Sequence, residues 1–283
     1  MSGMVERLQE LAGEDTEVCK ERCRVIDLAS LNQFAAEYGL TRRQAEIAAL
    51  RERVLPARYM RNLGTVGFDG QIALLEATVG VVGAGGLGGW IIEGLARMGV
   101  GRLFVVDSDV FGENNLNRQA ICREDNLGQP KVEAAKQRVA AVNAAVEVIA
   151  HQVRLNGPQM MAKLLSGCDV LVDALDSLAT RLDLQRAARE LQVPLVHGAI
   201  AGYVGQVMTI FPDDDGLLGL YGEREVPQHG IEVQWGNPAA TPMMVASWQI
   251  AEVVKLLARR GEPLRCRMLF MDSEGGTVDL LQV

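Results

Sequence analysis

The sequence predicts an α/β protein with a doubly wound, mostly parallel sheet of the Rossmann-like class, an N-terminal helical appendage and a C-terminal β-hairpin. Three observations predict this class. From residue 77 onward, short apolar strands alternate with helical patterns, as in parallel βαβ units. A glycine-rich turn joins the first of these strands to the helix after it. An aspartate ends the second strand, where folds of this class place a ribose contact.

Residues 1–57 are expected to form the helical appendage, and residues 58–283 the main domain. The stretches "SLNQFAAEYGL" and "RRQAEIAALRERVL" repeat apolar residues at steps of three and four, which is typical of helices. Thr41 followed by Gln44 fits a capping box at the start of the second helix. Cys19 and Cys23 are interpreted as helix residues one turn apart.

The main domain is expected to alternate strands and helices up to about residue 200. The expected strands are 78–82, 102–107, 146–151, 169–174 and 194–200. The expected helices are 87–98, 131–143, 158–165 and 178–191. A sheet of this kind binds its ligand at the carboxyl ends of its strands, so we expect the functional residues there.

The last part of the chain changes character. Residues 205–211 predict a strand, and residues 212–240 a long polar crossover loop, which is commonly a functional flap. Thr241 is interpreted as an N-cap followed by Pro242 at the first helical position, with the helix reaching Arg260. The stretches "RCRMLFMD" and "TVDLLQV", separated by "SEGG", predict a terminal hairpin.

Composition limits the functional classes. The chain has 283 residues and a formal net charge of −8, which argues against a general nucleic-acid or membrane-surface role. We expect no secretory signal and no membrane span, because charged residues interrupt every apolar stretch. The five scattered cysteines fit reduced thiols in the cytoplasm, and without any CxxC pair we expect no zinc site.

The turn "GAGGLGG" is the first candidate binding element. Gly83, Gly85, Gly86 and Gly88 allow backbone N–H groups to approach a phosphate at a helix N-terminus. The alternative is a tight strand–helix turn without a ligand. Asp107 follows Gly83 by 24 positions and can accept hydrogen bonds from ribose hydroxyls, which fits NAD and ATP equally well. We interpret Asp109 as a turn or capping residue.

The stretch "ENNLNRQ" favours ATP over a dinucleotide. Asn114, Asn115 and Gln119 supply amide donors, and Arg118 can spread phosphate charge through two parallel hydrogen bonds. As an isolated loop, the asparagines are turn formers and the arginine a solvated charge. Lys131 follows in "GQPK" at the head of a helix, where a cation opposes the helix dipole unless an anion compensates. The alternative for Lys131 is a surface lysine.

The stretch "VDALDSLATR" ends the fourth strand of the main sheet. Asp176 is our choice of Mg²⁺ ligand, because magnesium needs only one or two carboxylates when phosphates and waters complete its shell. Asp173 is an alternative ligand or a structural helix-capping acid. Ser177 is expected to contact the nucleotide.

These motifs carry a family resemblance. From about Arg58 to the end, the chain resembles the MoeB/ThiF/HesA family, which is related to the adenylation domains of ubiquitin-activating enzymes. The shared motifs are "RYMRN", "GFDGQ", "GAGGLGG", "VVDSDV", "NNLNRQ", "GQPK" and "DALDS", in order and at fitting spacings. The resemblance implies an adenylyltransferase that uses ATP and Mg²⁺ on the C-terminal glycine carboxylate of a small ubiquitin-like sulfur carrier, and a homodimer.

The resemblance also implies residue roles. Gly86 would contact the nucleotide phosphates and Asp107 the ribose. Asn115, Arg118 and Lys131 would hold the phosphates, and Asp176 would bind magnesium. Arg61 would reach into the partner subunit's site as an arginine finger; by itself it is interpreted as part of a solvated helix face. The chemistry agrees, because fixed cations at the α- and β-phosphates offset the repulsion between an attacking carboxylate and a triphosphate.

Some features depart from the family or leave other functions open. Many members hold zinc with two CxxC pairs, which this chain lacks, and no cysteine lies in the crossover loop to form a covalent intermediate. Ser177 replaces an asparagine often found after the metal aspartate. The alternatives are a nicotinamide-dependent oxidoreductase, a non-catalytic nucleotide-binding scaffold, and an adenylyltransferase of a nucleoside or small-molecule carboxylate. The carrier and its pathway stay open.

Overall fold

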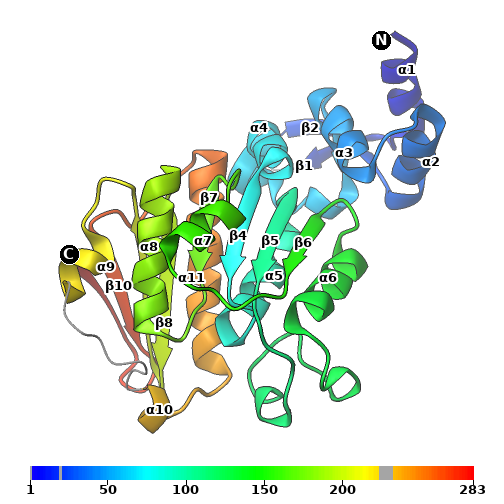
Figure 1. The fold of residues 1–283 in the computed structure, drawn as a ribbon. Helices are drawn as coiled ribbons and strands as arrows, with labels where there is room; N and C mark the ends of the chain where they lie inside the picture. Colours follow the sequence, from blue (N-terminus) through cyan, green and yellow to red (C-terminus); the bar gives the residue numbers. More distant parts are fainter. Residues whose placement is uncertain (1, 19–20, 223–231) are drawn as a thin grey trace.

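The computed structural model describes residues 2–18, 21–222 and 232–283 of the chain. Within these residues the main element is an eight-stranded sheet with the order β11-β10-β9-β8-β7-β4-β5-β6 (Figure 1). The strands from β6 to β8 run parallel to one another, whereas β9, β10 and β11 are each antiparallel to the strand before them. The prediction of a doubly wound, mostly parallel sheet is confirmed.

The strands of this sheet are β4 (Thr78–Val82), β5 (Arg102–Val106), β6 (Glu147–His151), β7 (Val170–Asp173), β8 (Leu195–Ala201), β9 (Val204–Ile210), β10 (Arg267–Asp272) and β11 (Thr277–Gln282). The helices from α4 onward are α4 (Leu63–Glu76), α5 (Gly86–Met98), α6 (Lys131–Val142), α7 (Pro158–Leu164), α8 (Leu178–Leu191), α9 (Gly216–Tyr221), α10 (Glu232–Trp235) and α11 (Ala240–Ala258). The elements expected between residues 78 and 211 are present, with boundaries shifted by one residue at most. The terminal hairpin of β10 and β11 is also confirmed.

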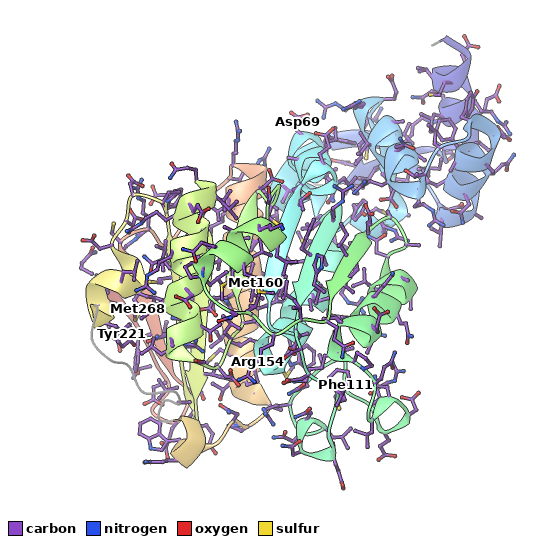
Figure 2. All side chains as sticks on the ribbon, in the orientation of Figure 1. Asp69, Phe111, Arg154, Met160, Tyr221 and Met268 are labelled. Carbon is purple, nitrogen blue, oxygen red and sulfur yellow. The ribbon has the colours of Figure 1, made fainter. Side chains whose placement is uncertain are left out.

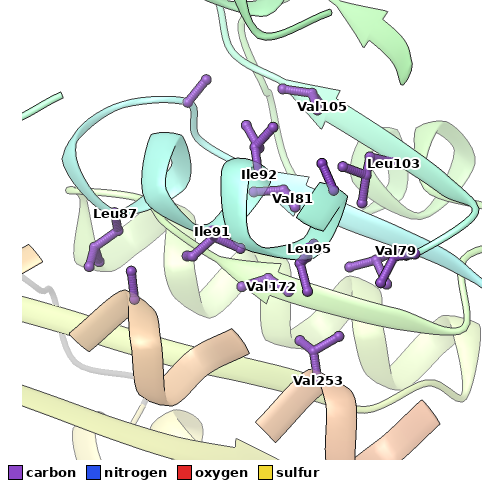
Figure 3. Packing of buried hydrophobic residues seen from close by; sticks show 14 of the residues in the cluster. Val79, Val81, Leu87, Ile91, Ile92, Leu95, Leu103, Val105, Val172 and Val253 are labelled. Atoms are coloured by element: carbon purple, nitrogen blue, oxygen red, sulfur yellow. The ribbon is translucent and has the colours of Figure 1, made fainter. Parts of the chain in front are cut away.

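The central strand β4 is buried along its whole length because helices cover both faces of the sheet. Such burial explains why its sequence is an apolar run and not an alternating pattern. Figure 3 shows Ile91 and Leu95 of α5 packed near Val79 and Val81 of β4, with Val253 of α11 beside them. These β-branched and leucine side chains form the largest core cluster and fix the start of α5 against the sheet.

The order of the strands creates a switch point at the centre of the sheet. The chain runs outward from β4 through β5 to β6, then returns to place β7 on the other side of β4. Helices α5 and α6 accordingly lie on one face with α11, and α7 and α8 on the opposite face (Figure 1). The carboxyl ends of β4 and β7 therefore lie side by side at the switch point, which is where this class of fold binds ligands.

The expectation that the first 57 residues form a purely helical appendage is wrong. They contain the helices α1 (Ser2–Leu11), α2 (Leu28–Tyr38) and α3 (Arg42–Arg51), but also a three-stranded sheet of β1 (Asp15–Val18), β2 (Glu21–Ile26) and β3 (Val54–Pro56). The capping box of Thr41 and Gln44 is confirmed. Cys23 lies on β2 and not on a helix, and Cys19 lies outside the described residues. The four central residues of β2, "RCRV", alternate charged and apolar side chains, a period-two signal that the helical interpretation passed over.

This amino-terminal unit is attached to the main domain through α3 and α4. Buried Glu46 of α3 accepts a hydrogen bond of 2.9 Å from the Tyr59 hydroxyl, and Tyr59 in turn accepts one of 3.0 Å from Asn143 after α6. Arg43 also donates to the Gly101 carbonyl at 2.7 Å. These contacts fix the unit near the amino ends of the central strands (Figure 1).

Two expectations for the last third of the chain are wrong in detail. Helix α11 begins at Ala240, so Thr241 is not its N-cap; instead its hydroxyl donates to the Gly202 carbonyl at 2.5 Å. The helix ends at Ala258, with Arg259 in the left-handed region. The expected loop 212–240 contains the short helices α9 and α10, and its middle, residues 223–231, lies outside the described part. No described helix is both long and apolar enough to span a membrane.

Candidate functional site

The four glycines of the turn after β4 fall into two pairs that differ in the space around them. Gly83 has a φ of +99°, and a side chain there would overlap the Ala174 carbonyl at the end of β7. A side chain on Gly88 would overlap the Gly83 carbonyl. By contrast, a Cβ on Gly85 or Gly86 would come no closer than 3.6 Å to any neighbour. The first pair is therefore required by the fold, whereas the second leaves the N-terminus of α5 open to a ligand.

Arg118 lies across this open turn. The nearest neighbours of a Cβ on Gly86 would be the side-chain atoms of Arg118, at 3.8 Å. The guanidinium donates to the Asn114 carbonyl at 2.9 Å and to the Asn117 side chain at 2.8 Å, which fixes it beside the turn. The stem of Arg118 therefore packs against the glycine turn, while its guanidinium bonds to its own loop.

Gln119 and the asparagines have different environments. Asn115 is buried and shapes the loop, since its side chain accepts from the Gly112 N–H at 3.1 Å and donates to Asn114 at 3.2 Å. Gln119 is also buried, lies next to Gly85, and its Oε1 has no hydrogen-bond partner among the described residues. An orphaned buried acceptor costs free energy unless a ligand or water pairs with it, so Gln119 marks a place for a polar ligand.

Asp107 and Lys131 flank the turn. Both Asp107 oxygens accept backbone hydrogen bonds, from Ala84 at 2.7 Å and from Asp109 at 2.8 Å, and a carboxylate has lone pairs left for a further donor. The Lys131 ammonium lies 3.0 Å from an Asp109 oxygen, and its side chain is only 7% exposed. Lys131 is thus not a surface lysine, and Asp109 is more than a turn residue because it binds this ammonium.

The turn after β7 carries the proposed metal ligand. Asp176 is exposed, and within the residues that the structure describes its carboxylate makes no hydrogen bond or ion pair. Ser177 occupies the N-cap position of α8 without a side-chain capping bond. No group of three metal-ligating side chains exists among the described residues. A lone free carboxylate still fits Mg²⁺ bound mainly by phosphates and waters, but not an all-protein cage.

Asp173 does not cap α8, whose N-cap is Ser177, and it is the most buried acid of the site. It ends β7 with no exposed surface, and its Oδ2 lies 2.7 Å from His197 Nδ1 on β8. The Arg181 guanidinium lies 3.9 Å from the same carboxylate. Sequence reasoning missed His197 and Arg181; the signal for the first was a histidine inside the apolar strand "PLVHGAI".

Arg61 lies away from the other candidates. It is exposed and precedes α4, and its neighbour Asn62 donates to Gln71, which donates to the Met98 carbonyl at the end of α5. Since α5 begins at the glycine turn and a helix of its 13 residues is about 20 Å long, Arg61 lies at the far end of that helix. Figure 2 shows Asp69 of α4 at that end of the molecule and Phe111, which follows β5, at the other.

The other groups at the carboxyl ends come from the loops after β5 and β6. Phe111 is buried and belongs to the largest core cluster. Arg154, in the loop after β6, is exposed and lies at this end of the sheet (Figure 2). The structure thus brings together the glycine turn, Asp107, Arg118 and Lys131, with the turn that bears Asp176 across the switch point; it does not bring Arg61 to them within one chain.

Comparisons with known proteins agree with this geometry. A model described as the ThiF family matches residues 59–283. The SAMP-activating enzyme E1 of Haloferax volcanii is 39% identical over 221 residues, which cover 76% of this chain and 81% of that protein. The molybdopterin-synthase adenylyltransferase of Salmonella typhimurium is 34% identical and the sulfur carrier protein adenylyltransferase of Thermus thermophilus 36%; each match covers 76% of this chain, and 88% and 83% of the respective relatives.

Solved structures support the fold. The complex of E. coli MccB with AMPCPP and MccA matches with a TM-score of 0.68 at 21% identity, and covers 80% of this chain and 71% of that chain. MccB with ATP matches with a TM-score of 0.65 at 20% identity, and covers 80% and 70%. At this identity the likeness concerns the fold alone.

Proposed function

The chain belongs to the ThiF family, and from this premise we propose that it adenylates the C-terminal glycine carboxylate of a small ubiquitin-like sulfur carrier at the expense of ATP. Three relatives, of each of which the match covers between 81% and 88%, are named for activating or adenylating SAMP, molybdopterin synthase and a sulfur carrier protein. The single structural observation that carries the proposal is the placement of Arg118 across Gly86, at the N-terminus of α5.

The reaction needs positive charge and little acid–base chemistry. A carboxylate oxygen attacks the α-phosphorus of ATP, the bond to the β-phosphate oxygen breaks, and pyrophosphate leaves with that electron pair. The attacking group is already an anion, so the main obstacle is repulsion between negative groups. Fixed cations next to the α-phosphate reduce that repulsion most in the transition state. Arg118 packs beside Gly86 of the glycine turn, and Lys131 is held by Asp109, two residues after Asp107, so both cations are anchored at this end of the sheet.

The remaining contacts follow the same logic. We assign Gly83, Gly85, Gly86 and Gly88 to the turn around the phosphates and Asp107 to the ribose. Asn114, Asn115, Gln119 and Ser177 complete the nucleotide site, of which Gln119 has the clearest basis because its buried Oε1 lacks a partner among the described residues. Asp176 would hold Mg²⁺, which supplies charge neutralisation at the phosphates when it is bound.

We further propose a homodimer in which Arg61 of one subunit completes the site of the other. The observation that supports it is the position of Arg61 about one helix length from its own glycine turn. An arginine at that position contributes to catalysis only if a second subunit brings it to a site. The carrier's flexible tail would enter under segment 212–240. The compartment would be the cytoplasm, with which the odd number of scattered cysteines is consistent.

Pyrophosphate exchange tests the proposed function. The full-length protein is incubated with ATP, Mg²⁺, labelled pyrophosphate and candidate carriers whose sequence ends in Gly-Gly, and labelled ATP is counted. We expect exchange that depends on the carrier and disappears when its last glycine is removed. Exchange without any carrier but with a small carboxylate would redirect the proposal to that substrate, and absence of exchange with every carrier tried counts against it.

A titration with NAD separates the proposal from an oxidoreductase. We expect ATP to stabilise the protein against heat and NAD to leave its melting temperature unchanged, because binding to the folded state alone raises stability. ATP binding without exchange under any condition would favour the non-catalytic scaffold.

A further inference from the structure

Buried polar groups surround the turn that bears Asp176 and take no part in the proposed chemistry. Asp173 and His197 are both almost completely buried and face each other in the register of the adjacent strands, Asp173 at the carboxyl end of β7 and His197 within β8. Their hydrogen bond of 2.7 Å joins Asp173 Oδ2 to His197 Nδ1. Buried carboxylates are costly unless they are paired, so a pair at this position requires an explanation beyond core packing.

The hydrogen bonds of His197 define its tautomer. Burial lowers the pKa of its imidazole, and the carboxylate of Asp173 acts in the opposite direction with a smaller effect. A neutral ring donates from Nδ1 to Asp173, and its Nε2 accepts from Gln206 Nε2 at 3.3 Å. Each ring nitrogen then has one partner, which holds the imidazole, and with it Asp173 Oδ2, in a single orientation.

The other Asp173 oxygen holds the turn itself. Asp173 Oδ1 accepts from the Leu175 N–H at 3.0 Å, which fixes the peptide between Ala174 and Leu175. Arg181 on α8 donates to the Leu175 carbonyl from Nε at 3.1 Å and also from its terminal nitrogen. Because a peptide unit is planar, a fixed Leu175 carbonyl also fixes the peptide that leads into Asp176. The two peptide planes before Asp176 are therefore both held.

Residues of α11, β8 and the glycine turn contact the same turn from other sides. Gln249 of α11 donates to the Asp173 carbonyl at 2.8 Å, and Gly198 leaves the space that its side chain occupies. Gly83 packs its backbone against the Ala174 carbonyl. The turn is thus coupled both to the nucleotide-binding turn and to the helix behind it.

We propose that Asp173, His197 and Arg181 are positioning residues that hold the turn 174–176 so that the Asp176 carboxylate projects into the site for the metal–nucleotide complex. This inference rests on the proposed function, because in that function Asp176 of this turn binds the magnesium ion. Partners behind a metal ligand that fix its orientation contribute to affinity without touching the metal.

The test measures metal affinity directly. Mn²⁺ replaces Mg²⁺, and its binding to the full-length protein with AMPCPP is followed by electron paramagnetic resonance. His197→Leu removes the donor to Asp173, whereas His197→Asn keeps an N–H near the position of Nδ1. We expect His197→Leu to weaken Mn²⁺ affinity by about tenfold or more and His197→Asn by at most about threefold. Arg181→Gln is a second, less buried variant that is expected to act like His197→Leu.

Thr209→Val is the matched control. Its hydroxyl donates to buried Glu252 at 2.6 Å, and on β9 it points to the opposite face of the sheet from its neighbour Met208, which pairs with His197. We expect it to lower the melting temperature without changing Mn²⁺ affinity. If His197→Leu and Arg181→Gln fold and bind Mn²⁺ as the unmodified protein does, or if Thr209→Val weakens Mn²⁺ binding equally, the positioning role is overturned.

The variant Asp176→Asn distinguishes failure of the positioning role from failure of the proposed function. If Asp176→Asn loses Mn²⁺ affinity while His197→Leu and Arg181→Gln keep it, only the positioning role is wrong. If Asp176→Asn binds Mn²⁺ normally, the metal assignment of the proposed function and the positioning role both fail. Carrier-dependent pyrophosphate exchange by the unmodified protein stands or falls independently of both results.

Discussion

The ammonium of Lys131 lies 3.0 Å from the carboxylate of Asp109, 22 positions earlier in the chain. The lysine is only 7% exposed, whereas the aspartate is 64% exposed. An ion pair with one well-solvated partner contributes little stability and is readily exchanged. Asp109 therefore keeps a buried cation in place at the head of α6 without holding it so tightly that a triphosphate could not displace it.

Arg118→Ala and Lys131→Ala are expected to lower the rate of pyrophosphate exchange by about 100-fold or more, because each removes charge that offsets repulsion in the transition state. The melting temperature is expected to change little. The matched controls are Arg123→Ala and Lys136→Ala, since both side chains are exposed and lie only five positions further along the chain. Unchanged exchange in Arg118→Ala or Lys131→Ala removes that residue from the mechanism.

The glycines of the turn are expected to separate stability from binding. Gly83→Ala places a side chain at a φ of +99° and against the Ala174 carbonyl, and is expected to destabilise the fold by about 2 kcal/mol or more. Gly86→Ala has free space and is expected to keep the stability within about 1 kcal/mol while weakening ATP binding. Chemical denaturation and calorimetric titration measure the two effects. Equal stability of both variants contradicts this division.

Arg61 is expected to act across the dimer. The Arg61→Ala and Lys131→Ala variants are each expected to be nearly inactive alone. When an equimolar mixture of the two is dissociated and re-associated, half of the dimers contain one subunit of each variant, and each such dimer has one complete site. The mixture is therefore expected to regain about a quarter of native exchange. If Arg61 served its own subunit's site, the mixture would regain nothing. Sedimentation of the same samples checks that dimers form.

Glu46 is expected to make stability depend on pH. Burial raises the pKa of its carboxyl above the ordinary value of 4.5, with Tyr59 and Arg58 opposing the shift. The folded state therefore binds this proton more tightly than the unfolded chain, and the resulting stability is complete below pH 4.5 and is lost as the pH rises through the folded-state pKa. Glu46→Gln should thus gain stability relative to the unmodified protein as the pH rises above 4.5, by at most about 1.4 kcal/mol per pH unit. A difference in melting temperature that stays constant over this range contradicts the assignment.

Much of the sheet could be predicted because its signals are local. The run "TVGVV" is apolar throughout since helices cover both faces, and the glycines mark the turn that follows. The same holds for the helix 178–191, whose bounds the apolar spacing alone predicts. The three-stranded amino-terminal sheet was not predicted because its strands are only three to six residues long, so few alternating residues compete with strong helical patterns on either side.

The candidate site was predictable only as far as motifs reach. Gly86 and Arg118 lie in motifs and are adjacent in space, as expected from two neighbouring strand ends. His197 and Arg181 belong to no such motif; their relation to Asp173 depends on the register of β7 with β8 and on the start of α8. Such contacts between distant segments follow from tertiary packing, which spacing along the chain does not specify. Thr241 illustrates the same limit, since its hydroxyl binds Gly202 and caps no helix.

A crystal structure of the full-length protein with Mg²⁺ and AMPCPP tests the central claim most directly. The distance from Lys131 Nζ to the nearest phosphate oxygen and to Asp109 is the measurement. We predict that the ammonium leaves Asp109 and lies within hydrogen-bond distance of an α- or β-phosphate oxygen, with the Arg118 guanidinium on the same triphosphate. A nucleotide bound at the glycine turn while Lys131 stays on Asp109 and Arg118 faces solvent would contradict the account.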